Sequence, residues 1–215
     1  MLRGPSQGAD DVLRHRVSKL GPDAYGILAA LAVLGRASPA SMVVKVAHVG
    51  RATRPLNELL SSGLVVKSLQ SGEIMLRMSR AHFSDRIYTW LREGERRRLH
   101  GRVSELIEEA SGLEIQDLAL HAIRAGRGEL AVRAALEAAE TLEVAYAYAA
   151  VASLLEEARE LAEGEQAIEL SGRLAELCEH IGRYEQALRH AQVVLEARLS
   201  DPSACLAVGR LELLS

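Results

Sequence analysis

Aromatic side chains are scarce in this chain of 215 residues, which contains one Trp, one Phe and five Tyr. Alanine and leucine must therefore fill the core, and these residues suit closely packed helices better than a sandwich of sheets. The chain is long enough to bury either one large core or two small ones. The lack of aromatics thus favours a mainly α-helical protein.

Long apolar segments and paired cysteines are lacking too. No run of about 18 apolar residues could span a membrane, and the N-terminal segment MLRGPSQGADD has no apolar signal-peptide core. The two cysteines, Cys178 and Cys205, lie far apart in the sequence, and we expect both to be buried, reduced thiols. These features predict a cytoplasmic protein that does not contact a membrane.

Signatures of catalysis are also missing. The sequence has no G-x-x-x-x-G-K-[ST] phosphate loop, no histidines grouped with cysteine or carboxylate at metal-ligand spacing, and no Ser/His/Asp arrangement. Residues 126–131 match the G-x-G-x-x-A dinucleotide fingerprint, but a helical segment precedes them where the fingerprint needs a strand. We interpret them as a turn between helices, and we expect no enzymatic activity, no cofactor and no metal.

The net charge of −3 hides a division between the two halves of the chain. Residues 1–102 carry 17 basic and 8 acidic side chains, whereas residues 103–215 carry 9 basic and 21 acidic ones, so the balances are +9 and −12. Such asymmetry suggests two units with different partners. The alternative is that the basic half faces the acidic half.

The first half of the chain predicts three helices followed by a two-strand ribbon. Gly21-Pro22-Asp23 starts the first of these helices and Gly35 ends it. This order is that of a winged helix-turn-helix domain, which we assign to residues 21–92, after a leader helix within residues 1–20. The later elements are a helix over 40–47 that Ser38-Pro39 opens and Gly50 ends, a helix over 51–60, and strands over 64–67 and 73–78.

The second half predicts a series of helices. A connecting helix over 93–112 follows a break expected at Glu93-Gly94. In residues 113–215, small residues recur at spacings that let helices pack closely, and Gly126 and Gly182 mark tight turns. We therefore predict an α-solenoid of tetratricopeptide-like repeats. An ordinary helical bundle is the alternative.

An apolar run near the C-terminus has no visible partner helix. Because a solenoid needs a polar capping helix at its end, we expect this segment either to pack against a second copy, forming a homodimer, or to fray. Its apolar residues are Leu206, Val208, Leu211, Leu213 and Leu214.

The order of winged helix, arginine-rich helix and helical repeats resembles the region that follows the ATPase core in STAND-class signal-transduction ATPases, which include the maltose-activator and LuxR-type ATP-dependent regulators. The resemblance is carried by Met78–Tyr88, Leu91, Arg97–His100 and Val103, and by the first repeat, Leu118–Gly126. It implies a regulatory scaffold whose winged helix packs against an ATPase domain and whose solenoid presents a surface to a partner protein or effector.

In these proteins the winged helix often carries a histidine that contacts the bound nucleotide. The corresponding position here is Arg80, and His82 lies two residues later. The resemblance therefore implies Arg80 or His82 as a contact to a nucleotide phosphate, which an arginine would bind as a permanent charge with a planar set of donors. A plain role at the surface or in the core is the alternative.

Direct DNA binding, as in a transcription regulator with a helical sensor domain, is the alternative function. A winged helix can place its third helix in the major groove; Arg51 and Arg54 would start that helix, and Lys67 would lie on the wing. The helix continues with Pro55 and Glu58, however, and offers fewer base-reading side chains than such helices usually carry.

The densest basic cluster lies instead on the connecting helix. We interpret it as a docking surface for an acidic protein, either the ATPase domain or the acidic half of this chain. A solvated stripe and a phosphate-binding face are the alternatives. This arginine cluster consists of Arg92, Arg96, Arg97, Arg98 and Arg102.

We expect the chain neither to bind ATP tightly nor to hydrolyse it, because it lacks the glycine-rich loop that cradles the phosphates and an acidic partner for magnesium. Isothermal titration with ATP and magnesium checks this expectation. Micromolar binding that Arg80→Ala abolishes would show instead that the winged helix holds nucleotide by itself.

Overall fold

The computed structural model describes residues 5–110, 115–198 and 202–214, and these residues are mainly α-helical, as the sequence predicts. The chain divides into two compact units, Met1–Leu106 and Ile107–Ser215. The boundary falls inside α6 (Glu93–Glu109), in the segment that the sequence assigns to a connecting helix. No helix in the described part of the chain is long and apolar enough to cross a membrane.

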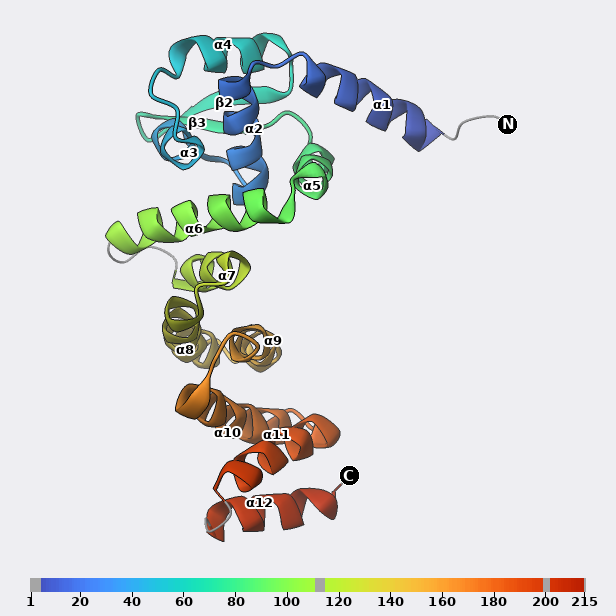
Figure 1. Ribbon diagram of the computed structural model, residues 1–215, viewed down its shortest axis with the longest axis vertical. Helices are drawn as coiled ribbons and strands as arrows, with labels where there is room; N and C mark the ends of the chain where they lie inside the picture. The colour runs from blue at the N-terminus through green and yellow to red at the C-terminus, as the bar shows by residue number, and fades with distance from the viewer. Residues whose placement is uncertain (1–4, 111–114, 199–201, 215) are drawn as a thin grey trace. The chain divides into compact units, whose positions relative to one another are not determined.

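The first unit combines helices with a small antiparallel sheet (Figure 1). Before α6, its elements are α1 (Pro5–Ser18), α2 (Pro22–Leu34), β1 (Ser38–Pro39), α3 (Ala40–Ala47), α4 (Thr53–Ser61), β2 (Val65–Gln70), β3 (Glu73–Met78) and α5 (Ala81–Trp90). Helix α2 forms the centre of this unit, because nine of its residues are buried and α3, α4, α5 and β3 all pack against it. Gly35 ends α2 with a left-handed φ of 67°, as the sequence predicts.

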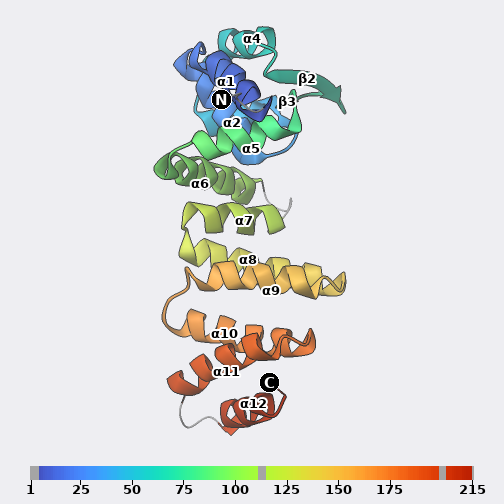
Figure 2. The ribbon, with the colours of Figure 1, turned by 90° about the vertical axis from the view of Figure 1, so that its right-hand side faces the viewer.

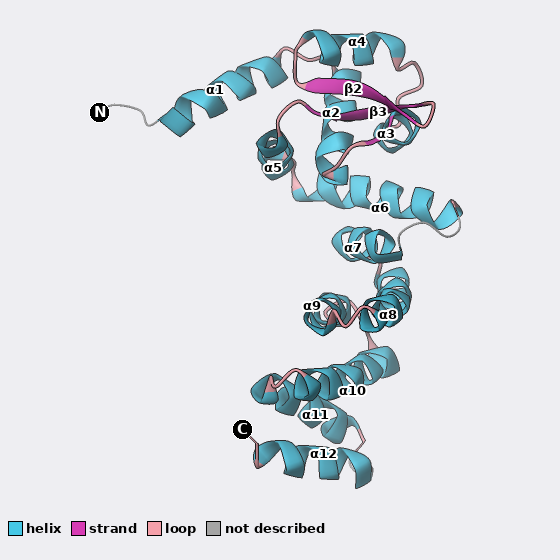
Figure 3. Cartoon of the chain, turned by 180° about the vertical axis from the view of Figure 1, so that it is seen from behind, coloured by secondary structure: helices cyan, strands magenta, loops and turns pink. Residues whose placement is uncertain are grey.

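The sheet has the strand order β1-β3-β2 with antiparallel neighbours (Figure 3). Ser71 and Gly72 close the hairpin between β2 and β3, with φ values of 50° and 83°. Two consecutive residues with positive φ match the twist of the flanking strands. This tight turn lets β2 continue to Gln70, so the strand is longer than the one over 64–67 that the sequence predicts.

Helix α3 has the predicted bounds, but its two ends and the break between α5 and α6 differ in detail from the prediction. Ser38-Pro39 opens α3 as predicted, with Pro39 as the N-cap, but these two residues also form β1, which pairs with β3. Helix α3 ends at Ala47 as predicted, but His48, with a left-handed φ of 58°, ends it in place of Gly50. The break between α5 and α6 falls at Leu91-Arg92, because Leu91 has an extended backbone and Glu93 already starts α6.

The second unit is a series of helices in which each helix packs against the next one in the chain (Figure 2). After the end of α6, these are α7 (Ile115–Ala125), α8 (Gly128–Val144), α9 (Tyr148–Arg159), α10 (Gly164–His180), α11 (Tyr184–Ala197) and α12 (Pro202–Glu212). Alanine supplies much of the core. Because an alanine side chain leaves little between two backbones, α7 and α8 can approach closely. Their fully buried alanines are Ala119, Ala122, Ala131, Ala135, Ala138 and Ala139.

One turn geometry occurs three times in this unit. Gly126, Tyr146 and Gly182 follow α7, α8 and α10 and adopt left-handed φ values of 73°, 56° and 75°. In each turn, the N–H of the next residue donates to the carbonyl five residues before it, at 3.0, 2.9 and 2.7 Å respectively. This pattern is the Schellman helix ending. The turns at Gly126 and Gly182 are as predicted, whereas the turn at Tyr146 is not, because tyrosine rarely adopts a positive φ.

Helix α12 packs against α11, so the expectation of an apolar run without a partner helix is wrong. Val208 and Leu211 are buried in this contact, whereas Leu206 and Leu213 are 75% and 89% exposed. A homodimer through the exposed side of α12 stays a prediction. Cys205 is exposed on the same helix, which corrects the expectation of two buried thiols.

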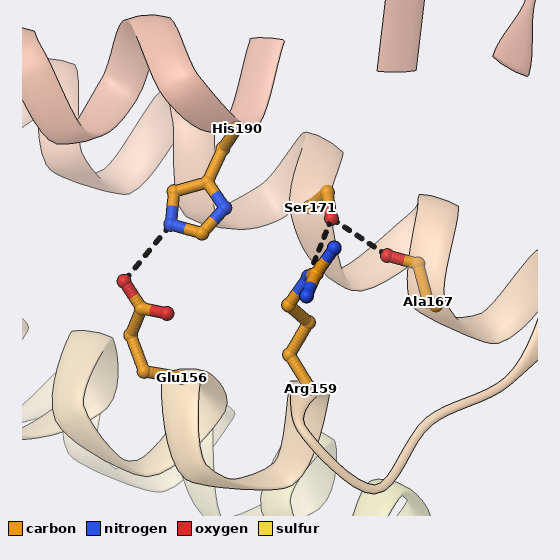
Figure 4. A network of polar contacts seen from close by, with 5 residues as sticks. All are labelled: Glu156, Arg159, Ala167, Ser171 and His190. Carbon is orange, nitrogen blue, oxygen red and sulfur yellow. Dashed lines mark hydrogen bonds and ion pairs between the residues drawn. The ribbon is translucent and has the colours of Figure 1, made fainter. Parts of the chain in front are cut away.

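Polar contacts tie α9, α10 and α11 together across the core (Figure 4). Nε2 of the buried His190 on α11 donates to Oε1 of Glu156 on α9 over 2.9 Å. Nε of Arg159 donates to the hydroxyl of Ser171 over 3.0 Å, and that hydroxyl donates to the carbonyl of Ala167 over 2.7 Å. Ser171 is fully buried, and a buried hydroxyl without a hydrogen-bond partner would lower the stability of the fold. These two hydrogen bonds prevent that loss.

We expect Tyr146→Gly to stabilise the second unit by about 1 kcal/mol, because a non-glycine residue in the left-handed region costs roughly 1–2 kcal/mol. Urea unfolding followed by circular dichroism measures the free energy of unfolding. Gly182→Ala is the matched control at an equivalent turn, and it should destabilise by a similar amount. A loss of stability in Tyr146→Gly would contradict the strained conformation.

Candidate functional site

The three candidate DNA contacts are all exposed in the first unit. Arg54 lies in the first turn of α4, Arg51 precedes that helix, and Lys67 lies on β2 opposite Leu76 of β3. Glu58, further along α4, is already engaged, because its carboxylate accepts a hydrogen bond from the N–H of Gly21 at 2.7 Å. Part of α4 therefore holds the start of α2.

Arg80 and His82 are both exposed at the N-terminus of α5. Arg80 has an extended backbone and immediately precedes the helix, and the His82 ring lies edge-on to Phe83 with ring centres 4.8 Å apart. Both basic side chains therefore lie where the helix dipole favours an anion.

The arginine cluster is divided by the fold, and two of its members face inward. The guanidinium of Arg96 lies 4.8 Å from the centre of the Tyr88 ring, and its Nη2 donates to the carbonyl of Thr89 over 2.8 Å. Nη1 of Arg102 donates to the carbonyl of Val46 over 3.2 Å. These two arginines hold α6 against α5 and α3.

The other members of the cluster remain accessible. Arg97 forms an exposed ion pair of 2.6 Å with Glu93, one helical turn earlier. Arg92 and Arg98 are exposed, and Arg92 lies in the break before α6. A docking surface at the start of α6 would therefore consist of three arginines and not of five.

A hydrogen bond to a buried histidine joins α5 and α6 next to the arginine cluster. His100 is fully buried and its Nε2 is 3.0 Å from the Tyr88 hydroxyl, a hydrogen bond. Nearby on α2, burial and then the charge of Glu95 raise the pKa of the Tyr25 hydroxyl, while Arg92 lowers it. Tyr88 and His100 lie 12 positions apart, so the sequence gave no local signal that they are partners.

The second unit contains an open groove of about 740 Å³ that sequence reasoning did not find. The end of α8, the start of α9, the length of α10 and the end of α11 line it. Within this lining, Nη2 of Arg173 donates to Oε1 of Glu143 over 3.0 Å. The Tyr148 ring lies edge-on to His180 with ring centres 4.7 Å apart. The lining of the groove therefore contains both charged side chains and aromatic rings.

In the part of the chain that the structure describes, no three His, Cys, Asp or Glu side chains lie close enough together to hold a metal ion. Burial raises the pKa of the Cys178 thiol, which disfavours the reactive thiolate.

Comparison with known proteins gives little. No protein-family model matches the chain, and no curated protein matches it in sequence. A solved structure similar to it is the crystal structure of a signal transduction ATPase with numerous domains (STAND) protein with a tetratricopeptide repeat sensor from Pyrococcus horikoshii. The two are 14% identical with a TM-score of 0.48, and the match covers 94% of this chain. The chain spans 36% of the length of that protein.

We expect Arg96→Ala to lower the free energy of unfolding of the first unit by about 1–2 kcal/mol, because it removes a hydrogen bond and a cation–π contact. Arg98→Ala is the matched control and should change stability by less than about 0.5 kcal/mol. Thermal and urea unfolding compare the two variants. Equal effects would contradict the division of the arginine cluster.

Proposed function

We propose that the chain is a non-catalytic regulatory scaffold that contacts other proteins, with a winged helix-turn-helix domain in the first unit and tetratricopeptide-like repeats in the second. The sequence motifs that resemble STAND-class regulators motivate this function. In such an arrangement the helical repeats bind the partner and the winged helix docks an ATPase domain.

The observation that carries the proposal is the turn that recurs at Gly126, Tyr146 and Gly182. Each of these turns reverses the chain between two helices that pack on one another. Stacked helix pairs of this kind expose extended surfaces, which repeat proteins use to bind other proteins. The groove beside Tyr148 lies on such a surface.

The assignment of a winged helix rests on the order of elements in the first unit. Helix α2, the short strand β1, helices α3 and α4, and the β2–β3 hairpin follow one another in the order typical of that domain. Three exposed arginines of this unit are available to an acidic protein surface: Arg92 just before α6, and Arg97 and Arg98 on it. We therefore favour an acidic protein domain as the partner of this unit.

DNA binding is the second candidate function. The first unit exposes three basic side chains that could contact DNA, namely Arg51 just before α4, Arg54 in its first turn and Lys67 on β2. The bond between Glu58 and Gly21 argues against it, since a recognition helix usually keeps its polar side chains for base edges.

A salt-dependent DNA titration separates the two functions. We expect the full chain to show no tight binding to a mixed-sequence duplex at about 50 mM salt, where phosphate contacts are strong. The variant Arg51→Glu/Arg54→Glu should behave like the wild type, as should the control variant Arg97→Glu/Arg98→Glu. Micromolar binding that falls steeply towards about 200 mM salt, and that disappears only in the first variant, would contradict the scaffold function. It would support a DNA-binding regulator instead.

A further inference from the structure

The groove of the second unit is flanked by aromatic side chains in a chain that has very few. Tyr148 lines the groove, and the Tyr146 ring lies edge-on to it with ring centres 6.2 Å apart. His180, which also lines the groove, lies edge-on to Tyr148 with ring centres 4.7 Å apart. Two of the five tyrosines of the protein therefore lie in the groove or next to it.

Tyr146 occupies a position where the equivalent turns have glycine. Its backbone is left-handed, and its side chain is 80% exposed, so neither the fold nor the core requires a large ring there. Its neighbour Val144 is 82% exposed. An exposed aromatic side chain held in an unfavourable backbone conformation beside a groove is typical of an anchor for a partner.

The charges of the groove favour a cation. Its two arginines are already neutralised, because Arg173 pairs with Glu143 and Arg198 pairs with Glu165. Two further carboxylates, those of Glu169 and Glu176, also line the groove, and no ion pair or hydrogen bond engages them in the described ranges. They are seven residues apart and so lie on one face of α10, with Arg173 between them.

We propose that this groove binds an extended segment of a partner protein through an arginine or lysine side chain, which packs on Tyr146 and Tyr148 and places its charge near Glu169 and Glu176. Aromatic rings and carboxylates together attract such a side chain, since the rings contact its stem and their faces attract its cation. An acidic segment would meet two unpaired carboxylates and two occupied arginines. The inference rests on the proposed scaffold function and adds the chemistry of the partner.

Selection from a displayed library of random 12-residue peptides on the full chain identifies the preferred ligand. The enriched peptides should share an arginine or lysine, and fluorescence anisotropy should show about 10-fold weaker binding when that residue becomes glutamine. Tyr148→Ala and the double variant Glu169→Gln/Glu176→Gln should weaken the same peptide by about 10-fold. Glu157→Gln, an exposed glutamate of α9 outside the groove, is the matched control and should bind as the wild type does.

The variant Tyr146→Gly distinguishes a role of Tyr146 in peptide binding from a role in folding. It should bind the peptide more weakly by about 5-fold or more although its fold is more stable, a combination that damage to the fold cannot produce. Tyr146→Phe keeps the ring and should retain binding.

Three outcomes would overturn the inference: enrichment of acidic or uncharged peptides, equal binding of the cationic peptide to the groove variants, or no enrichment from the library. The scaffold function has a different point of failure, namely DNA binding that depends on Arg51 and Arg54. The two failures are therefore distinguishable.

Discussion

The second unit depends on how closely its helices approach one another, and alanine sets that distance. Ala119 and Ala122 of α7 and Ala131 and Ala135 of α8 are fully buried, while no Phe, Trp or Tyr is among the buried core residues of the described chain. Adding even a few methylenes to such a core would cost about 1–3 kcal/mol. Closely packed helices can be joined by very short turns. The left-handed residue that recurs in these turns and the small side chains of the core both follow from this close packing of helices.

Local patterns were predictable where one residue decides the conformation. Gly35, Gly126 and Gly182 end helices as the sequence indicates, because glycine alone enters the left-handed region at no steric cost. Boundaries that depend on tertiary contacts were not predictable. Ser38-Pro39 becomes a strand only because β3 lies beside it, and α12 has a partner only because the chain returns to α11.

The candidate sites show the same limit. Sequence identified the arginine cluster, but it could not tell that Arg96 would lie over Tyr88 and Arg102 would reach Val46. It also gave no signal that Arg173 would pair with Glu143, since these residues lie 30 positions apart. The pair of tyrosines at 146 and 148, unusual in a chain so poor in aromatics, was the one local signal that could have pointed to the groove.

The small sheet of the first unit has two edges, and both discourage another molecule from adding a strand. Strand β1 is two residues long and includes Pro39, which has no N–H to donate. Strand β2 is longer and its tip exposes Leu69 opposite Ile74, but Lys67 places a charge midway along it. A lysine on an edge strand opposes edge-to-edge pairing. The charge of Lys67 on β2 thus has a structural consequence of its own, which does not depend on any contact with nucleic acid.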